Sequence, residues 1–268
     1  MDSQHNPEEQ AELPFESALS LLEKRGRHSA LSTGSPNLDR LTGGLEPGLF
    51  YLIYGNDDYE LPDTLLLRLL VEAVGNDGAR AAYLLCGNYR RSRTVMDSEL
   101  LLSLIDASGL DAEDSLSRIH IVSAFSERHL LKAPALVKGL LDEHGVFTLV
   151  AVQQVAKLFY GEDALRFEEL AEFTGVVSRL RAMCSERGVT LVATCRSSRR
   201  VGPIPLPEGG SFLRHSANAI FYLRESGRGL ASAYAVKHPK KRREGMVVRF
   251  GEISSGGEYR ARSTCFSS

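Results

Sequence analysis

Residues 31–64 read LSTGSPNLDRLTGGLEPGLFYLIYGNDDYELPDT, and this stretch decides the fold that we expect. Its apolar, aromatic-rich run Leu49–Tyr54 predicts a buried strand. Gly55 follows this run, then an acidic loop, then helical periodicity over Pro62–Val74. A strand, a glycine and a helix in this order favour an α/β protein.

The rest of the chain extends this pattern. The further expected strands are Ala81–Cys86, Ile119–Val122, Phe147–Val152 and Val189–Cys195, and the further expected helices are Ser98–Ala107, Glu127–Glu143 and Phe167–Arg187. Strands that are apolar on both faces and separated by helices predict a mostly parallel sheet flanked by helices. After Cys195 the apolar pattern alternates over residues 217–223, 230–237 and 245–250, which predicts an antiparallel C-terminal extension.

The loop after Gly55 stands where a phosphate-binding loop would lie, but it lacks that loop's chemistry. In G-x-x-x-x-G-K-[ST], backbone amides surround the phosphates, the Lys neutralises charge and the hydroxyl holds Mg²⁺. Gly55 keeps the first position, whereas the second Gly, the Lys and the Ser/Thr are replaced by Glu60, Leu61 and Pro62. Asp57 and Asp58 add two carboxylates to the loop. No Lys occurs between Lys24 and Lys132, so no shift in register supplies one.

Three segments resemble the RecA/RadA-type recombinases. Leu31–Gly48 resembles the segment that leads into their phosphate-binding loop, and Val146–Phe159 resembles their Walker B strand. Glu208–Arg228 resembles the end of their second DNA-binding loop and the strand after it. The resemblance runs from Phe15 onward and implies a RecA-like ATPase core over residues 31–268. Before this core we expect a disordered acidic arm, residues 1–13, and a docking helix with a linker, residues 14–30.

The resemblance also implies that the catalytic positions are degenerate. Gln153 stands at the Walker B Asp, and its amide lacks the negative charge that Mg²⁺ prefers. Arg196 stands at the γ-phosphate-sensing Gln, no acid occupies the general-base position within Leu85–Asn88, and Lys237–Pro239 replaces the Asp-Ser-Pro cap. We therefore expect a pseudo-ATPase without metal or cofactor. Weak ATP binding through Gly55, and a salt bridge between the loop carboxylates and Arg196, are left open.

Two features point to partners. Phe15 and Ala18 resemble the F-x-x-A element by which recombinase protomers join, which implies docking on a RadA/RecA-type recombinase, a sister paralogue or a second copy. The alternative is that Phe15 packs on the chain's own core. From Arg196 to Arg243 the chain carries eleven Lys or Arg and two acids, which favours a polyanion such as single-stranded DNA.

The resemblance places non-specific DNA binding in this basic region. The expected contacts are Arg196, Arg199, Arg200, Gly209, Gly210, Arg214, His215, Lys240, Lys241, Arg242 and Arg243. The first DNA-binding loop should fall at Tyr160–Glu172, where Arg166 stands alone among acids and contact with phosphates is not expected. The run His238–Arg243 is equally compatible with a nuclear localisation signal or an exposed hairpin tip.

Our first hypothesis is therefore a catalytically inactive recombinase paralogue that acts as a cap, scaffold or mediator in homologous recombination and DNA repair. The alternatives are a RecA-fold regulatory adaptor that does not act on DNA, and a metal-dependent enzyme that uses Asp57, Asp58 and Glu60.

The four cysteines have no metal-site spacing, and no signal peptide or membrane-spanning run occurs. We expect a cytoplasmic protein, or a nuclear one in a eukaryote.

Overall fold

The computed structural model describes residues 30–55, 60–76, 78–87, 96–159, 167–198, 204–227, 230–240 and 247–250. The predicted arm, residues 1–13, and nearly all of the predicted docking segment, residues 14–30, lie outside this part of the chain, so Phe15 and Ala18 have no structural description. None of the helices within the described ranges is long and apolar enough to cross a membrane.

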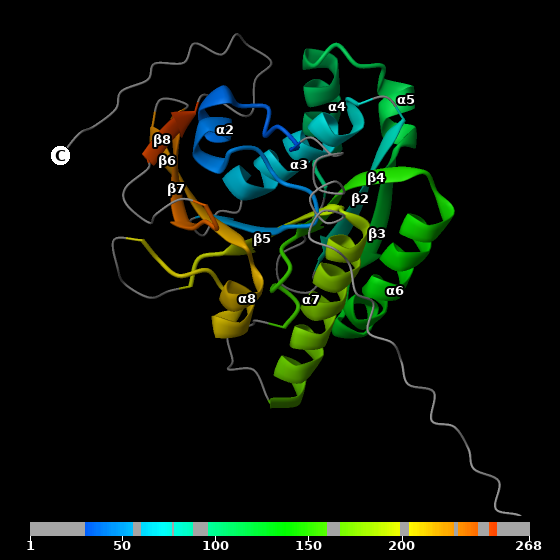
Figure 1. The fold of residues 1–268 in the computed structure, drawn as a ribbon, viewed down its shortest axis with the longest axis vertical. Helices are drawn as coiled ribbons and strands as arrows, with labels where there is room; N and C mark the ends of the chain where they lie inside the picture. Colours follow the sequence, from blue (N-terminus) through cyan, green and yellow to red (C-terminus); the bar gives the residue numbers. More distant parts are fainter. Residues whose placement is uncertain are drawn as a thin grey trace, which may run out of the picture.

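The described strands form one eight-stranded sheet in the order β3-β2-β4-β5-β1-β6-β7-β8 (Figure 1). Their bounds are β1 Phe50–Gly55, β2 Ala79–Cys86, β3 Ile119–Ala124, β4 Val146–Gln153, β5 Thr190–Arg196, β6 Ala219–Gly227, β7 Leu230–Lys237 and β8 Val247–Phe250. In the order of the sheet, all neighbours in the run β3-β2-β4-β5-β1-β6 pair in parallel. The neighbours in β6-β7-β8 pair in antiparallel. The predicted mostly parallel sheet with an antiparallel extension is confirmed.

The prediction was incomplete at β6. This strand belongs to the antiparallel extension through its pairing with β7, but its other edge pairs in parallel with β1, from Tyr51↔Ala219 to Tyr54↔Tyr222. Alternating polarity does not distinguish these two cases, because it reports which face of a strand is buried and not the direction of its neighbour.

Helices cover both faces of the sheet, with α2 to α5 on one face and α6 to α8 on the other (Figure 1). Their bounds are α2 Pro36–Thr42, α3 Glu60–Val74, α4 Ser98–Ala107, α5 Ala112–Ser117, α6 Glu127–Glu143, α7 Phe167–Arg187 and α8 Gly210–Ser216. The predicted bounds of α4, α6 and α7 match these. The sequence reasoning missed α2, α5 and α8, because six or seven residues are too short for helical periodicity to be recognised.

Helix α2 lies inside the segment Leu31–Gly48, just before β1. The Ser35 hydroxyl accepts a hydrogen bond from the Leu38 backbone N–H and caps the helix start. Gly43, with a φ of 78°, ends the helix in the left-handed conformation that glycine adopts without steric cost. The S-T-G-S and G-G residues of this segment therefore delimit a helix just before β1.

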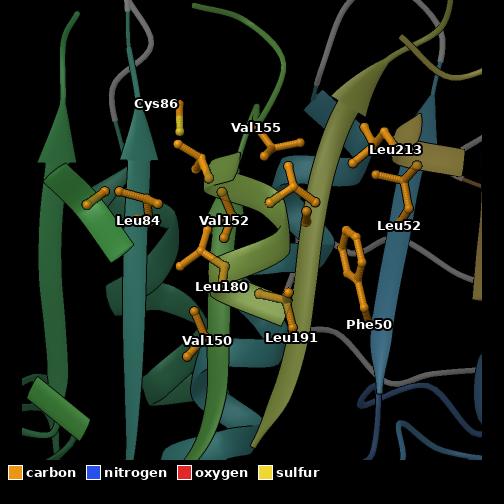
Figure 2. Close-up of a cluster of buried hydrophobic side chains, with 14 of the residues drawn as sticks. Phe50, Leu52, Leu84, Cys86, Val150, Val152, Val155, Leu180, Leu191 and Leu213 are labelled. Atoms are coloured by element: carbon orange, nitrogen blue, oxygen red, sulfur yellow. The ribbon is translucent and has the colours of Figure 1, made fainter. Parts of the chain in front are cut away.

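Two apolar layers, one on each face, hold the sheet between the helices. In the layer shown in Figure 2, side chains of β1, β2, β4 and β5 pack beside Leu180 of α7 and Leu213 of α8. Each fully buried aliphatic side chain contributes about 1.5–3 kcal/mol relative to an exposed one. The carboxyl ends of the parallel strands form the site described next.

Candidate functional site

Three of the predicted site residues meet where parallel strands end. Gly55 ends β1, Gln153 ends β4 and Arg196 ends β5. The register places Gly55 opposite Arg196, and β4 is the other neighbour of β5. Ligand sites of open α/β sheets lie at such carboxyl ends. Helix α3 begins at Glu60, after the loop that follows β1, and directs one further side chain into this edge.

That side chain is Asp63. Its Oδ1 accepts hydrogen bonds from Thr194 Oγ1 at 2.6 Å and from Gln154 Nε2 at 2.9 Å. Its Oδ2 accepts from Gln153 Nε2 at 2.8 Å and again from Gln154 Nε2 at 2.9 Å. We call Asp63, Gln153, Gln154 and Thr194 the Asp63 cluster. It joins the first turn of α3 to the ends of β4 and β5 through side chains alone.

Both glutamines of the cluster are buried, with exposed fractions of 5% for Gln153 and 2% for Gln154. Gln153 Oε1 accepts a hydrogen bond from the Tyr83 hydroxyl of β2, so both ends of its amide have a protein partner. The Gln153 side chain, at the predicted Walker B position, therefore forms its hydrogen bonds with Tyr83 and Asp63 of the same chain.

Gln154 is the only non-glycine residue with a positive φ, 55°, in the part of the chain that the structure describes. Such a conformation costs on the order of 1 kcal/mol and persists where surrounding contacts fix it. Here the Gln154 N–H donates to Thr194 Oγ1 at 3.0 Å, and the Val155 N–H donates to the Thr194 carbonyl at 2.9 Å. These bonds attach the turn after β4 to β5 and turn the Gln154 amide towards Asp63.

Burial dominates the electrostatics of the cluster. It raises the pKa of the Asp63 carboxyl above its usual range, while the hydrogen bonds from Thr194, Gln153 and Gln154 and the nearby Lys157 oppose the shift. Burial likewise raises the pKa of the Tyr83 hydroxyl, and the Asp63 charge adds to that effect. Burial lowers the pKa of the Lys157 amine, against the attraction of Asp63 and Glu208.

Two of the loop positions that we predict to be degenerate, Leu61 and Pro62, make apolar contacts in the structure. Pro62 is buried against Gly55, so closely that a Cβ added to Gly55 would lie 2.9 Å from the Pro62 Cγ. Leu61 packs against the apolar layer on the α3 face of the sheet. Glu60 begins α3, and Asp57 and Asp58 lie outside the described residues, so the alternative of a metal-dependent site on these acids stays a hypothesis. No group of three or more His, Cys, Asp or Glu within the described ranges could hold a metal ion.

The predicted DNA contacts have varied surroundings. Arg196 Nε lies 3.5 Å from Glu208 Oε2, and Lys240 Nζ lies 2.6 Å from Glu46 Oε1. Arg214 Nε donates to the Gly210 carbonyl at 3.3 Å, and His215 is exposed. Gly209 and Gly210 open α8 with φ values of 100° and 74°. Arg199, Arg200, Lys241, Arg242 and Arg243 lie outside the described residues.

In the segment at the predicted cap position, Lys237 and His238 bond to other parts of the same chain. Lys237 Nζ donates to the carbonyls of Arg214, His215 and Ala217 and so caps the end of α8. A ring nitrogen of His238 lies 2.9 Å from the Thr42 carbonyl at the end of α2.

Sequence reasoning missed Asp63, Gln154, Thr194, Tyr83 and Lys157. A signal for Asp63 was present, because Leu66, Leu67 and Leu70 follow it at the spacing of one helix face and all three are buried. An acid on the buried face of an apolar helix needs polar partners. The sequence offered no comparable signal for which strand ends would supply them.

Comparison with known proteins places the chain beside two curated relatives. It is 27% identical over 222 residues to the DNA repair protein RAD51 of Saccharomyces cerevisiae, and the aligned region covers 76% of this chain and 53% of that protein. It is 27% identical over 224 residues to the DNA repair protein rhp51 of Schizosaccharomyces pombe, covering 77% of this chain and 58% of that protein. The chain thus spans little more than half the length of these relatives. No protein-family model matches it.

Proposed function

This chain is a homologue of the RecA-family recombinases, and we propose that it is a pseudo-ATPase that serves as an accessory subunit in homologous recombination and DNA repair. The observation that carries the proposal is the Asp63 cluster. The edge formed by β4, β5 and α3 holds a carboxylate that is hydrogen-bonded to Gln153, Gln154 and Thr194.

The chemistry of phosphoryl transfer supports the pseudo-ATPase assignment. Hydrolysis requires a metal held by an acid, a cation on the phosphates and a residue that orients water. Gln153 offers an amide at the metal position, Leu61 offers an apolar side chain at the Lys position, and Pro62 offers no hydroxyl. The Asp63 carboxyl lies beside the place expected for a polyphosphate, and its ionised form would repel phosphate there.

The sheet edge formed by β3 supports docking on a recombinase-type partner. β3 is the terminal strand of the sheet, and edge strands accept added strands from other chains. Ile121 on β3 is 49% exposed, and Leu102 of α4 and Leu116 of α5 are also exposed. An F-x-x-A segment of a recombinase, a sister paralogue or a second copy fits this chemistry, and Phe15 and Ala18 are the corresponding donor on this chain.

DNA contact rests on the basic region from Arg196 to Arg243. Arg214 and the exposed His215 lie together on α8, which follows the Gly209-Gly210 turn. We propose modest, sequence-independent binding of single-stranded DNA, dominated by phosphate contacts and therefore steeply weakened by salt.

The decisive experiment is a pull-down from native lysate with the full chain, Phe15→Glu and the matched control Glu16→Ala, followed by mass spectrometry. Loss of a recombinase or paralogue with Phe15→Glu alone supports the accessory-subunit proposal. Absence of every recombination protein from all three samples contradicts it. An assay of Mg²⁺–ATP turnover by the purified chain tests the pseudo-ATPase part separately, since turnover above the background rate contradicts it.

A RecA-fold regulatory adaptor that does not act on DNA is the second candidate. One observation favours it: Arg196 and Lys240, two of the expected DNA contacts, form ion pairs with Glu208 and Glu46 of the same chain. A titration of single-stranded DNA binding against salt separates the candidates. The adaptor predicts no binding at low salt, whereas the accessory subunit predicts binding that falls steeply as salt rises.

A further inference from the structure

Three basic side chains gather at the amino-terminal ends of the strands, the opposite ends from the Asp63 cluster. Arg80 lies on β2, His120 lies on the terminal strand β3, and His144 lies directly after α6. Helix α6 packs on β3 (Figure 1), and the turn after it leads into β4, which pairs with β2. All three side chains are half-buried. We call Arg80, His120 and His144 the His120 cluster.

His120 contacts each of the neighbouring elements. Its Nε2 lies 3.1 Å from Arg80 Nη1. Its ring stacks on the His144 ring, with centroids 4.9 Å apart and planes at 19°, and lies 5.5 Å from the Phe147 ring of β4. A Cβ added to Gly145 would lie 3.2 Å from Arg80 Nε, so Arg80 also packs against the turn between α6 and β4. The cluster therefore joins β2, β3 and this turn.

The sheet is irregular beside the cluster. Arg80 pairs with Phe147, but Ala81 pairs with Leu149, so the register passes over Thr148. Irregularities of this kind locally disrupt the ladder and redirect the side chains beside them. The contacts of the His120 cluster thus lie where the regular pairing of β2 with β4 is interrupted.

The contact with Arg80 fixes the protonation state of His120. A guanidinium only donates hydrogen bonds, so His120 Nε2 accepts and the neutral ring carries its proton on Nδ1. A second proton would occupy Nε2, remove the acceptor and place an imidazolium against the guanidinium, which like charges oppose. Within the described ranges, no carboxylate forms an ion pair with Arg80, His120 or His144.

The surroundings of His120 act in the same direction. Burial lowers the pKa of its imidazole, and His144 and Arg80 lower it further. The other charged groups on α6 and α5, the two helices that pack on β3, are exposed, and the half-buried Arg118 after α5 pairs with Asp114. Both titratable or charged groups that face His120 therefore disfavour its imidazolium.

We propose that the His120 cluster is a proton-sensitive switch, which holds the turn between α6 and β4 against β2 and β3 at neutral pH and releases it when His120 takes up a proton. Because β3 is the terminal strand of the sheet, where other chains can add a strand, the switch alters the edge that a partner would meet. The switch is built from described residues alone and does not depend on the proposed function.

An NMR titration of the full chain, labelled with ¹⁵N, tests the switch without any variant. The nitrogen chemical shifts of an imidazole identify which ring nitrogen carries the proton. At neutral pH we expect His120 in the Nδ1–H form, with a titration midpoint below that of histidine in the urea-unfolded chain. The amide signals of Gly145 and Val146 should shift with the same midpoint.

Three results of this titration would overturn the proposal. They are a proton on His120 Nε2 at neutral pH, a His120 midpoint at or above that of the unfolded chain, and signals of Gly145 and Val146 that do not follow His120. The matched control is His129→Gln on α6, because His129 is exposed and should leave the shifts of Gly145 and Val146 as in the wild type. An equal loss of these shifts in His129→Gln would contradict the assignment to His120.

A second variant, His120→Gln, extends the test to stability, because its amide oxygen can accept from Arg80 but does not titrate. Since the folded-state pKa of His120 is lowered, the unfolded chain binds more protons below the ordinary histidine value, and stability is lost as pH falls through that window. Between about pH 7 and 5, the unfolding equilibrium constant in urea should rise more steeply in the wild type than in His120→Gln, with a limit of about tenfold per pH unit for one proton. Equal steepness in the two proteins would contradict the switch.

Discussion

Replacing Asp63 by Asn tests the central feature of the site with little change in shape. Each carboxylate oxygen of Asp63 accepts two hydrogen bonds, with Gln154 bonding both oxygens. An amide offers one acceptor oxygen, so in either orientation its NH₂ group faces the Gln153 amide or the Thr194 hydroxyl. At least one buried donor then loses its partner, which costs about 1–3 kcal/mol of unfolding free energy.

The pH dependence of this loss has a definite sign. Because the folded-state pKa of Asp63 is raised, the folded chain binds more protons than the unfolded chain between the ordinary aspartate pKa and the folded value. The wild type therefore loses stability as pH rises through that window, and Asp63→Asn does not. We expect the difference between the two proteins to be largest at the acidic end and to shrink as pH rises.

Urea unfolding followed by far-UV circular dichroism measures both quantities, and Asp142→Asn provides a control of opposite sign. Hydrogen bonds from Lys138 and Arg187 lower the pKa of Asp142, so its contribution to stability is lost as pH falls through its folded-state pKa. The effect of Asp142→Asn should therefore shrink towards acidic pH. An Asp63→Asn variant as stable as the wild type at every pH would refute the assignment of Asp63 as the acceptor of three donors. A deficit that grows with pH would contradict the raised pKa of its carboxyl.

Three further changes test neighbouring parts of the site. Gly55→Ala should lower the unfolding free energy by about 1–3 kcal/mol, because its new Cβ would lie 2.9 Å from Pro62, and Pro62→Ala should recover part of the loss in thermal denaturation. Lys237→Met should cost about 1 kcal/mol by removing the charged donor at the end of α8, seen as faster hydrogen exchange of that helix and contradicted by unchanged exchange. Leu61→Lys combined with Pro62→Thr should leave ATP turnover at background, because Gln153 stays at the metal position; appreciable turnover would show the interpretation of the site to be wrong.

Most of the parallel core could be predicted from the sequence. Runs such as Phe147–Val152 are buried on both faces, so apolar content alone marks them, and α6 and α7 are long enough for periodicity to fix their ends. The same reasoning could not detect that β6 pairs in parallel with β1, because pairing direction depends on how the chain crosses the sheet.

The site was predictable only in part. The phosphate-binding-loop pattern identified Gly55, and the resemblance to the recombinases identified Gln153 and Arg196. The structure places all three at the ends of neighbouring strands. The bond from Asp63 to Thr194 joins positions 131 residues apart, and the left-handed backbone of Gln154 is set by its contacts with β5. Neither leaves a local pattern in the sequence.

The position of Asp63 explains how this edge of the sheet is held together. At the predicted Walker B position the strand carries the amide of Gln153, and the first turn of α3, where the helix dipole favours an anion, carries the carboxylate of Asp63. With the acid on the helix and the amides at the end of the strand, β4, β5 and α3 are joined by hydrogen bonds. In a cluster joined in this way the polar groups of the four side chains find their partners within the chain itself, which lowers the cost of burying them.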